Sequence, residues 1–437
     1  MTFMMQREQA STRPYNILSL DGGGTWAIIQ AMSLEDLYGS NTPGHTILKN
    51  FDLVVANSGG SLVAAGLWAN MTPAQLITEF KSELIRKQIF SKLPLFKTWA
   101  RAILKVGPKY FADAKLQAIR TLINKYDSGL GDEPIARLPL PRSQADPDVT
   151  DLILLAYDYD TNRAKFLRTG TYSAAGSQLD NIPYKTTLAE AVHASTNAPI
   201  NYFNAPATIS YSKTPIRAWD GAIAGYNNPI LAGITEALAN RVDRKSIQVL
   251  SIGTASRVLP LTGGEFQAAY EWMEARPSKK GFWILGDLRK LSMSIIENPP
   301  DVATYTAFFM IDDQLDWMGT PIDDPRRSKT KIVRLNPLMQ PVVVPGRELF
   351  DVPSGHSNRP DKLTPGGFRY LMELDMDAVE EADVDLICLF GRLWIDEWDR
   401  GRDASCLAPP ARTRTGPIKA SGSYLGCLAA KRTAGHG

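Results

Sequence analysis

The stretch Val54-Val55-Ala56-Asn57-Ser58-Gly59-Gly60-Ser61 decides the fold, because an apolar run stops abruptly at a serine and two glycines. A helix-like segment follows through Trp68. This pattern is typical of a sharp turn from a buried strand into a helix, in which small residues such as Ala56 and Gly60 tolerate a strained backbone at the serine. The serine hydroxyl then projects from the helix N-terminus, where free amides stabilise negative charge. The segment alone fits both a nucleophile elbow and a serine that caps an ordinary helix.

Short apolar runs alternate with segments of helical spacing around this stretch. The runs at 16–20, 51–57, 151–157 and 247–252 have the length and composition of buried strands. Helical spacing of apolar residues follows at 26–38, 61–69, 188–195 and 230–241. This alternation predicts a three-layer α/β/α fold with a mainly parallel central sheet. Active sites of such sheets form at the carboxyl ends of the strands, where the glycines at 22–24 and Ser58 both fall.

One large domain is predicted over residues 15–395, followed by a tail. Residues 263–327 are irregular and contain tryptophans and prolines, which indicates an inserted cap over the site. Residues 403–437 are basic and lack periodicity, which predicts a disordered tail. Residues 72–109 interleave basic and apolar side chains, which fits either helices packed on the sheet or a surface that lies on lipid.

Composition and charge exclude several classes of protein. A formal net charge of +2 gives no reason to expect a nucleic-acid polymer as partner. The three cysteines form no paired motif, so neither a disulfide framework nor a metal site is predicted. Residues 1–14 lack the apolar core of a signal peptide, and no apolar run is long enough to span a membrane. We therefore expect a cytoplasmic protein.

An activated serine needs a base, and an aspartate is the stronger candidate. Asp220 lies in Ala218-Trp219-Asp220-Gly221-Ala222, a tight turn that precedes another helix. A carboxylate held there accepts a serine proton if burial raises its pKa. A Ser-His-Asp triad would need His193 or His356, and neither histidine has a local signature.

Three motifs, in their order along the chain, resemble the patatin-like phospholipases and acyl hydrolases. They are Asp21-Gly22-Gly23-Gly24, Ser58-Gly59-Gly60, and Asp220-Gly221-Ala222 before Asn227-Asn228-Pro229. Supporting matches lie at 194–199 with Tyr202-Phe203 behind, at 151–158 and at 249–254. The resemblance covers roughly residues 15–260, with weaker similarity at 375–389, and its specificity comes from the ordered combination of the motifs.

The resemblance implies a patatin-like fold and a phospholipase A-type acyl hydrolase with a Ser-Asp dyad. Ser58 would attack an ester carbonyl of a phospholipid or another acyl lipid, and Asp220 would take the serine proton. The amides of Gly22, Gly23 and Gly24 would hold the oxyanion, and water would release the fatty acid. The resemblance also implies peripheral membrane contact and no metal or other cofactor. The motifs are completed by Asp21, Thr25, Gly59, Gly60, Gly221 and Ala222.

The chain departs from the family pattern beside the glycine loop. The family usually has an arginine and a glycine two and three residues after the triple glycine, where this chain has Trp26 and Ala27. Ala56 replaces the first glycine of the elbow and is small enough to keep the turn. Loss of the arginine leaves a second hypothesis open, a catalytically impaired relative that binds lipid or regulates a partner.

Another enzyme class shares the glycine-loop sequence. Asp21-Gly22-Gly23-Gly24-Thr25 also matches the phosphate loop of sugar kinases with the actin-like ATPase fold. That fold places a β-hairpin after the loop, whereas residues 26–38 have helical spacing, and it gives no role to Ser58 or Asp220. Some bacterial patatin-like proteins are antiphage effectors that a cyclic nucleotide activates, but the sequence shows no nucleotide site that assigns this role here.

Overall fold

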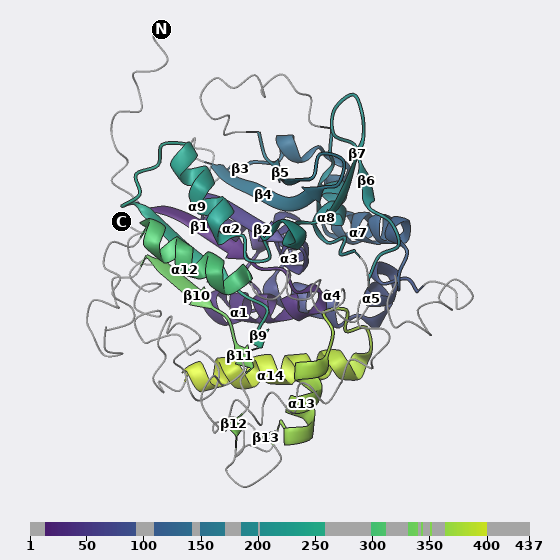
Figure 1. Cartoon of the computed structure of the whole chain (residues 1–437), viewed down its shortest axis with the longest axis vertical. Helices are drawn as coiled ribbons and strands as arrows, with labels where there is room; N and C mark the ends of the chain where they lie inside the picture. Colours follow the sequence, from purple (N-terminus) through teal and green to yellow (C-terminus); the bar gives the residue numbers. More distant parts are fainter. Residues whose placement is uncertain are drawn as a thin grey trace, which may run out of the picture.

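A central β-sheet carries helices on both of its faces (Figure 1). The computed structural model describes residues 14–92, 109–141, 149–170, 185–199, 202–257, 299–311, 331–339, 342–343, 350–351 and 363–399. The strands are β1 (Tyr15–Leu20), β2 (Leu53–Asn57), β3 (Leu140–Pro141), β4 (Val149–Asp158), β5 (Arg163–Arg168), β6 (Ala207–Ile209), β7 (Ile216–Asp220), β8 (Ile247–Ile252), β9 (Ser256–Arg257), β10 (Ile332–Leu335), β11 (Leu338–Met339), β12 (Val342–Val343) and β13 (Phe350–Asp351).

Helices lie in several of the connections between these strands and after the last strand. The α-helices are α1 (Ile28–Tyr38), α2 (Gly44–Leu48), α3 (Gly59–Trp68), α4 (Pro73–Lys81), α5 (Glu83–Ile89), α7 (Ala112–Tyr126), α8 (Leu188–Ser195), α9 (Ile230–Ala239), α12 (Pro299–Ile311), α13 (Pro365–Glu373) and α14 (Glu381–Asp399). Short 3-10 helices are η1 (Gly24–Ala27), η3 (Leu130–Asp132), η4 (Ile135–Arg137) and η6 (Gly221–Ala224).

The main sheet has the strand order β10-β8-β1-β2-β4-β7-β6, with β3 and β5 also paired to β4. All neighbouring pairs from β10 to β4 are parallel, whereas β5 and β7 pair antiparallel with β4. Every residue of β2 is buried, as expected for a parallel strand that is covered on both faces. The predicted mainly parallel sheet is thus confirmed, and β8 coincides with the predicted strand at 247–252.

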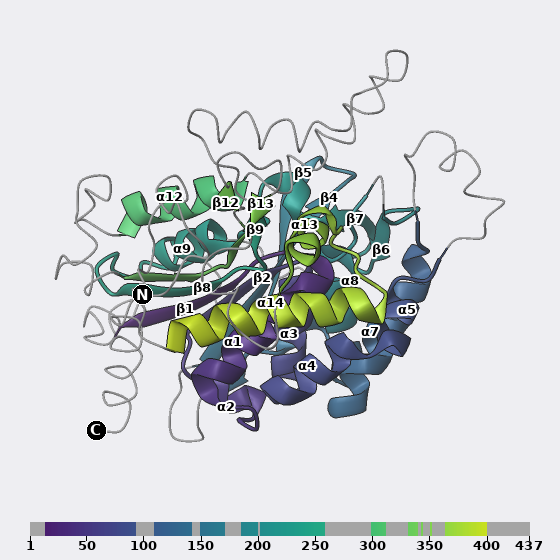
Figure 2. The ribbon, with the colours of Figure 1, turned by 90° about the horizontal axis from the view of Figure 1, so that it is seen from below.

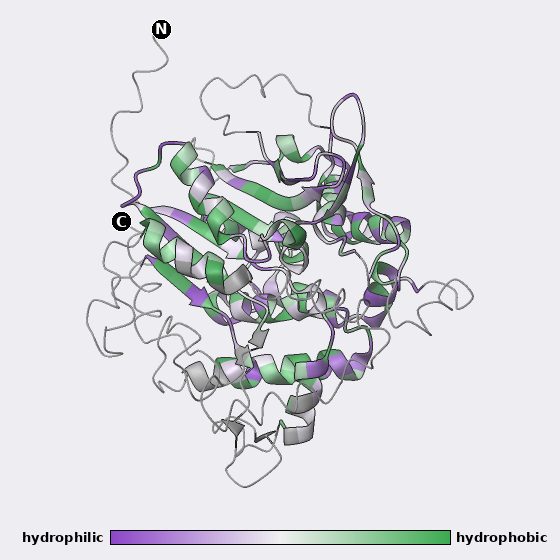
Figure 3. Ribbon diagram, viewed as in Figure 1, coloured by the Kyte–Doolittle hydropathy of each residue, from purple (hydrophilic) through white to green (hydrophobic). Residues whose placement is uncertain are grey.

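Two helical layers enclose the sheet (Figure 2). On one face α9 packs against β1, β2 and β8, and α12 packs on α9. On the other face α3 packs against β1 and β2, while α1 contacts α4 and α14. Figure 3 shows that the central strands are mostly hydrophobic, whereas the helices carry mixed colours. The three-layer α/β/α prediction is therefore confirmed.

The predicted helices form, with small differences at their ends. The helix at 188–195 matches α8, and α3 begins at Gly59, two residues before the predicted start. Within 72–109, α4 and α5 are helical, and Thr72 starts α4 with a capping box in which its hydroxyl accepts the Gln75 amide at 3.2 Å. Residues 93–108 lie outside the described residues.

Several predictions fall on residues that the structure does not describe. The predicted cap at 263–327 lies outside the described residues except for α12, and the tail at 403–437 lies entirely outside them. Among the helices of the described residues, none combines the length and the apolar character needed to cross a membrane.

Strand β4 brings two distant parts of the sequence together. On one edge, β5 pairs with β4 from Ile153 to Asp158. The other edge is shared, because β2 pairs with residues 151–155 and β7 pairs with residues 156–158. Since β2 runs parallel and β7 antiparallel to β4, their carboxyl ends meet: Asn57 lies opposite Leu155, and Asp220 lies opposite Ala156. The residue after β2 therefore lies beside the last residue of β7.

Candidate active site

Ser58 occupies a strained turn between β2 and α3. Its backbone φ of 48° lies in the left-handed region that side chains other than glycine rarely adopt. The Ser58 amide donates to the hydroxyl of Ser195 at 3.1 Å, and that hydroxyl also bonds the Ser61 hydroxyl at 2.8 Å. These contacts hold the turn in place and leave the Ser58 hydroxyl at the N-terminus of α3.

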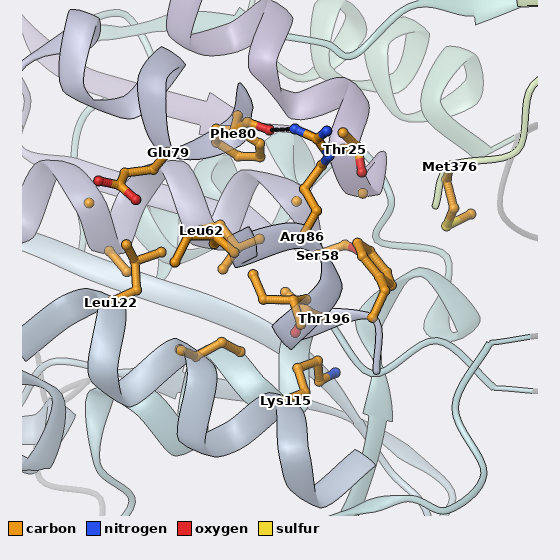
Figure 4. Close-up of a pocket in the computed structure, with 18 of the residues that line it drawn as sticks. Thr25, Ser58, Leu62, Glu79, Phe80, Arg86, Lys115, Leu122, Thr196 and Met376 are labelled. Carbon is orange, nitrogen blue, oxygen red and sulfur yellow. Dashed lines mark hydrogen bonds between the residues drawn. The ribbon is translucent and has the colours of Figure 1, made fainter. Parts of the chain in front are cut away.

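The glycines of the elbow are required by close packing. A Cβ atom on Gly59 would lie 2.5 Å from the carbonyl oxygen of Gly24, and one on Gly60 would lie 2.5 Å from the carbonyl oxygen of Leu20. Real Cβ atoms do not approach other atoms this closely. The glycine loop after β1 therefore lies directly against the start of α3, next to Ser58 (Figure 4).

Asp220 presents its carboxylate to Ser58 at the junction of β2 and β7. Its Oδ1 accepts the amide of Ala222 at 2.9 Å and the side-chain amide of Asn57 at 3.0 Å. The Ser58 hydroxyl lies close enough to this carboxylate to favour its ionised form. Gly221 is needed for the approach, because a Cβ atom there would lie 2.5 Å from Oδ1 of Asn57. The structure thus brings the two predicted dyad residues together.

Burial controls the protonation of Asp220. The side chain is almost completely buried, and this desolvation raises the pKa of the carboxyl group above its ordinary value. The hydrogen bonds from Ala222 and Asn57, the nearby Ser58 hydroxyl and the charge of Lys115 lower this pKa and so act in the opposite direction. A raised pKa makes the carboxylate a better proton acceptor for a serine hydroxyl.

The three amides of the glycine loop differ in their availability. The Gly22 amide donates to the carbonyl of Asn227 at 2.8 Å, so it is already engaged. Within the described residues, the amides of Gly23 and Gly24 donate no hydrogen bond, and neither does the amide of Gly59 at the start of α3. The set of amides free to face an oxyanion therefore differs from the expected one, because Gly22 serves to fix the loop.

Asp21 and Thr25 anchor the two ends of this loop. Asp21 forms a buried, bidentate ion pair with Arg334 of β10, whose Nη1 lies 2.8 Å from Oδ1. Arg334 also donates to the hydroxyl of Ser251 at 2.7 Å. The Thr25 amide donates to the carbonyl of Met376 at 2.9 Å. Both anchors, Arg334 and Met376, come from the C-terminal part of the chain.

The two residues that depart from the family pattern lie in the protein core. Trp26 is 5% exposed, and Ala27 is fully buried. A Cβ atom on Gly59 would lie 2.9 Å from that of Ala27, so Ala27 packs under the elbow. Trp26 therefore contributes to core packing at a position where the family usually has a charged side chain.

An apolar pocket extends from Ser58 into the protein. Ser58, Gly59, Gly24 and Thr25 are part of its lining, and apolar side chains cover most of the rest (Figure 4). Examples of these are Leu62, Leu76, Phe80, Ile89, Ile119 and Leu122. The apolar character of this lining suits an acyl chain.

Two charged residues of the pocket lining, Arg86 and Glu79, form hydrogen bonds with other parts of the protein. Arg86 donates to the carbonyls of Phe80 and Val379, both at 2.8 Å. Glu79 accepts hydrogen bonds from Lys125 and Tyr126 at 2.6 and 2.5 Å. Among the described residues, no group of three or more His, Cys, Asp or Glu side chains is placed to hold a metal ion.

Sequence reasoning missed several residues that support the site. Asn57 directly precedes Ser58, and its signal is a polar residue at the end of an apolar strand, which is unusual. Ser195 lies in a motif that was recognised only as a supporting match. Arg334, Lys115 and Met376 carry no local signal. The helix α1 after the glycine loop contradicts the sugar-kinase alternative, which requires a β-hairpin there.

Comparisons with known proteins agree with these motifs. Residues 18–234 match the family model described as patatin-like phospholipase. Patatin-T5 of Solanum tuberosum is 26% identical over 313 residues, covering 69% of this chain and 74% of the relative. Patatin-17 of Solanum cardiophyllum is 25% identical over 319 residues with the same two shares. The crystal structure of VipD from Legionella pneumophila covers 89% of this chain and 76% of VipD, with 11% identity and a TM-score of 0.29 that supports no detail of fold or site.

The matched segment contains the glycine loop, the elbow with Ser58, and Asp220 at the end of β7. The family supports lipid acyl hydrolysis as the general activity, within the hydrolases. The chain therefore carries a patatin-like phospholipase domain over residues 18–234.

Proposed function

We propose that the protein hydrolyses acyl esters of phospholipids or other acyl lipids through Ser58 and Asp220. The observation that carries the proposal is the Ser58 hydroxyl, which is held at a strained elbow against the buried Asp220 carboxylate, at the end of an apolar pocket. An ordinary helix cap does not require a left-handed backbone, because capping residues usually adopt extended geometry. The strain favours the nucleophile reading of Ser58.

The first half of the reaction forms an acyl-enzyme. Asp220 accepts the proton of the Ser58 hydroxyl as its oxygen attacks the ester carbonyl carbon. The carbonyl oxygen becomes an oxyanion, for which the amides of Gly23, Gly24 and Gly59 are the available donors. The carbon–oxygen bond to the alcohol then breaks, and Asp220 returns the proton to the leaving alkoxide.

The second half restores the enzyme. Asp220 accepts a proton from a water molecule, whose oxygen attacks the acyl carbon of the Ser58 ester. The new oxyanion meets the same amides, and its collapse breaks the bond to Ser58 Oγ. Asp220 gives the proton back to Ser58, and the fatty acid leaves. No histidine is needed in this scheme, because a single carboxylate carries the proton in both halves.

The substrate class follows from the pocket and from the family. An apolar pocket stabilises an acyl chain by removing it from water. A lipid substrate also requires contact with a membrane surface, and the exposed Leu84 on α5 supports such a contact near the pocket. We propose peripheral membrane binding on this side, which vesicle co-sedimentation of the wild type and of Leu84→Asp would test.

The test of the catalytic proposal is hydrolysis of p-nitrophenyl esters and mixed phospholipid vesicles by the wild type, Ser58→Ala and Asp220→Ala. Ser82→Ala is a matched control, because Ser82 only caps α5. We expect activity in the wild type and the control, and its loss in both dyad variants. Equal activity in all four proteins would refute the mechanism. Lipid binding by a wild type that never hydrolyses an ester would instead favour the impaired regulatory relative.

A further inference from the structure

A lysine with no exposed surface lies beside the proposed dyad. Lys115 is on α7, is fully buried, and lines the same pocket as Ser58. Lysine is almost never fully buried in proteins unless its charge is paired, because removing an ammonium group from water is costly. Lys115 takes no part in the proposed proton transfers, so a different role must account for its buried position.

The surroundings of Lys115 Nζ fit an ammonium group. Nζ donates to the carbonyl of His193 at 3.2 Å and to the side-chain oxygen of Asn197 at 3.0 Å. It also lies 3.9 Å from the centre of the Phe203 ring. The face of an aromatic ring is negative and attracts an N–H group, whereas it repels the lone pair of a neutral amine. Two oxygens and one ring face thus match the three hydrogens of a charged lysine.

Asn197 connects this lysine to the proposed base. The carbonyl of Asn197 accepts the backbone amide of Asp220 at 3.0 Å. The side-chain amide of Asn197 donates to the carbonyl of Ala205 at 2.9 Å, so the residue is fixed on both sides. Lys115 therefore fixes Asn197, and the carbonyl of Asn197 in turn fixes the backbone of Asp220.

Charge links the same two residues. Burial lowers the pKa of Lys115 and raises that of Asp220, while each charge favours the ionised form of the other. His193 on α8 is the other titratable group that faces Lys115, and burial, followed by the Lys115 charge, lowers the pKa of its imidazole. Burial thus opposes both charges, whereas the two oxygens and the ring face around Nζ favour the Lys115 ammonium, whose charge in turn favours the Asp220 carboxylate.

We infer that Lys115 is a positioning residue for the hydrolysis: it fixes Asn197 and keeps Asp220 in the ionised form that accepts the Ser58 proton. This inference rests on the proposed function, because it assigns a supporting role in that reaction. A purely structural role is the competing explanation, in which Lys115 only satisfies a carbonyl near the end of α8. Such a role would change stability but not the pH dependence of the reaction.

The test compares pH profiles of kcat/KM on a soluble p-nitrophenyl ester for the wild type, Lys115→Met and Lys125→Met. Lys125 lies on the same helix, and its exposed side chain pairs with Glu79. We expect the acid limb of the Lys115→Met profile to move to higher pH by about one unit, which lowers kcat/KM roughly tenfold at any pH on that limb. At alkaline pH the difference in kcat/KM between Lys115→Met and the wild type should shrink. The profile of Lys125→Met should coincide with that of the wild type.

A second variant separates the charge from the packing. Lys115→Ala opens space beside the pocket, so added ethylammonium should restore activity on the acid limb, whereas ethanol, which is of similar size and neutral, should not. The inference fails if the acid limb of the pH profile of Lys115→Met coincides with that of the wild type. It also fails if Lys115→Met loses the same factor in kcat/KM at all pH values and ethylammonium restores no activity in Lys115→Ala. A wild type that neither hydrolyses the ester nor reacts with a fluorophosphonate would overturn the proposed function and this inference together.

Discussion

The family-matched part of the chain, residues 18–234, and the C-terminal part, residues 331–399, contact the same end of the pocket in different ways. The first part supplies Ser58 and Asp220 from strand ends, within glycine motifs that fix the local backbone. The second part supplies Arg334 to Asp21 and the Met376 carbonyl to Thr25, from sequence surroundings without any motif. Reactive groups can thus be recognised from local sequence, whereas the contacts that hold them come from anywhere in the chain.

The meeting point of the two parts is Gly24, and replacing it should have the largest effect. Gly24 has a φ of +57°, and a Cβ atom there would lie 2.3 Å from the carbonyl oxygen of Met376. Gly24→Ala should push the glycine loop away from the C-terminal part and misplace a proposed oxyanion donor. We expect kcat to fall by about 10²–10³, the effect of losing one such donor, with a smaller change in KM.

Gly129→Ala is the matched control for this substitution. Gly129 also has a positive φ, of +88°, but nothing lies within 4 Å of an added Cβ atom. Both variants carry backbone strain, whereas only Gly24→Ala carries the clash. If the two variants lost the same activity, strain alone would account for the effect, and the contact with Met376 would have no catalytic importance.

Replacing Arg334 tests whether the C-terminal part stabilises the family-matched part. Arg334→Met would leave the buried carboxylate of Asp21 without its partner. Breaking a buried ion pair on one side typically lowers the free energy of unfolding by about 3–5 kcal/mol. Urea unfolding of the wild type and the variant would measure this loss.

The double variant Asp21→Asn with Arg334→Met removes both charges and should recover much of the stability, because no buried charge is then left unpaired. A stable double variant with reduced kcat would show that the pair orders the glycine loop for the reaction. If the midpoint of urea unfolding were the same for Arg334→Met and the wild type, this ion pair would not couple the stability of the two parts of the chain.

The pH dependence of the wild type should be set by the family-matched part. Burial raises the pKa of Asp220, and the proposed base acts in its ionised form. The rate therefore stays constant above this raised pKa and falls roughly tenfold per unit as the pH drops below it. Because the folded state binds this proton more tightly than the unfolded chain, the free energy of unfolding decreases as the pH rises through the same window.

A kcat/KM profile on a soluble ester measures the limb, and urea unfolding in the same buffers measures the stability. Arg334→Lys is an informative companion, because Arg334 pairs with Asp21 and not with Asp220. The acid limb of the kcat/KM profile of Arg334→Lys should coincide with that of the wild type. A rate that stayed constant down to about pH 4, near the ordinary value for aspartate, would contradict Asp220 as a base of raised pKa.

The sequence predicted those features that depend on neighbouring residues. The strand before Ser58, the turn itself and the helix after it follow from one apolar run and two glycines, and all three are present. The helix after the glycine loop followed in the same way from apolar spacing. These features could be predicted because backbone sterics and side-chain periodicity act over a few residues.

Features that depend on strand pairing could not be predicted in this way. The approach of Asp220 to Ser58 arises because β2 and β7 share one edge of β4, and no local pattern encodes that pairing. The engaged amide of Gly22 follows from the placement of Asn227, and the charge balance of Asp21 follows from the distant Arg334. The proposed dyad was therefore identified through the resemblance, while its hydrogen-bond partners emerged only from the fold.

The smallest effect is expected for the Met376 side chain, which lines the same pocket as Ser58 and packs against the cluster that contains Tyr110, Tyr202 and Phe203. Met376→Ala keeps the carbonyl that accepts the Thr25 amide and removes only side-chain volume. Because the residue is partly buried, the free energy of unfolding should fall by about 1 kcal/mol. The widened pocket should raise kcat/KM for bulkier acyl esters a few-fold relative to short ones, which a series of p-nitrophenyl esters would measure. An unchanged ratio would mean that the C-terminal part acts on the site through its backbone and through Arg334 and leaves substrate choice to the family-matched part.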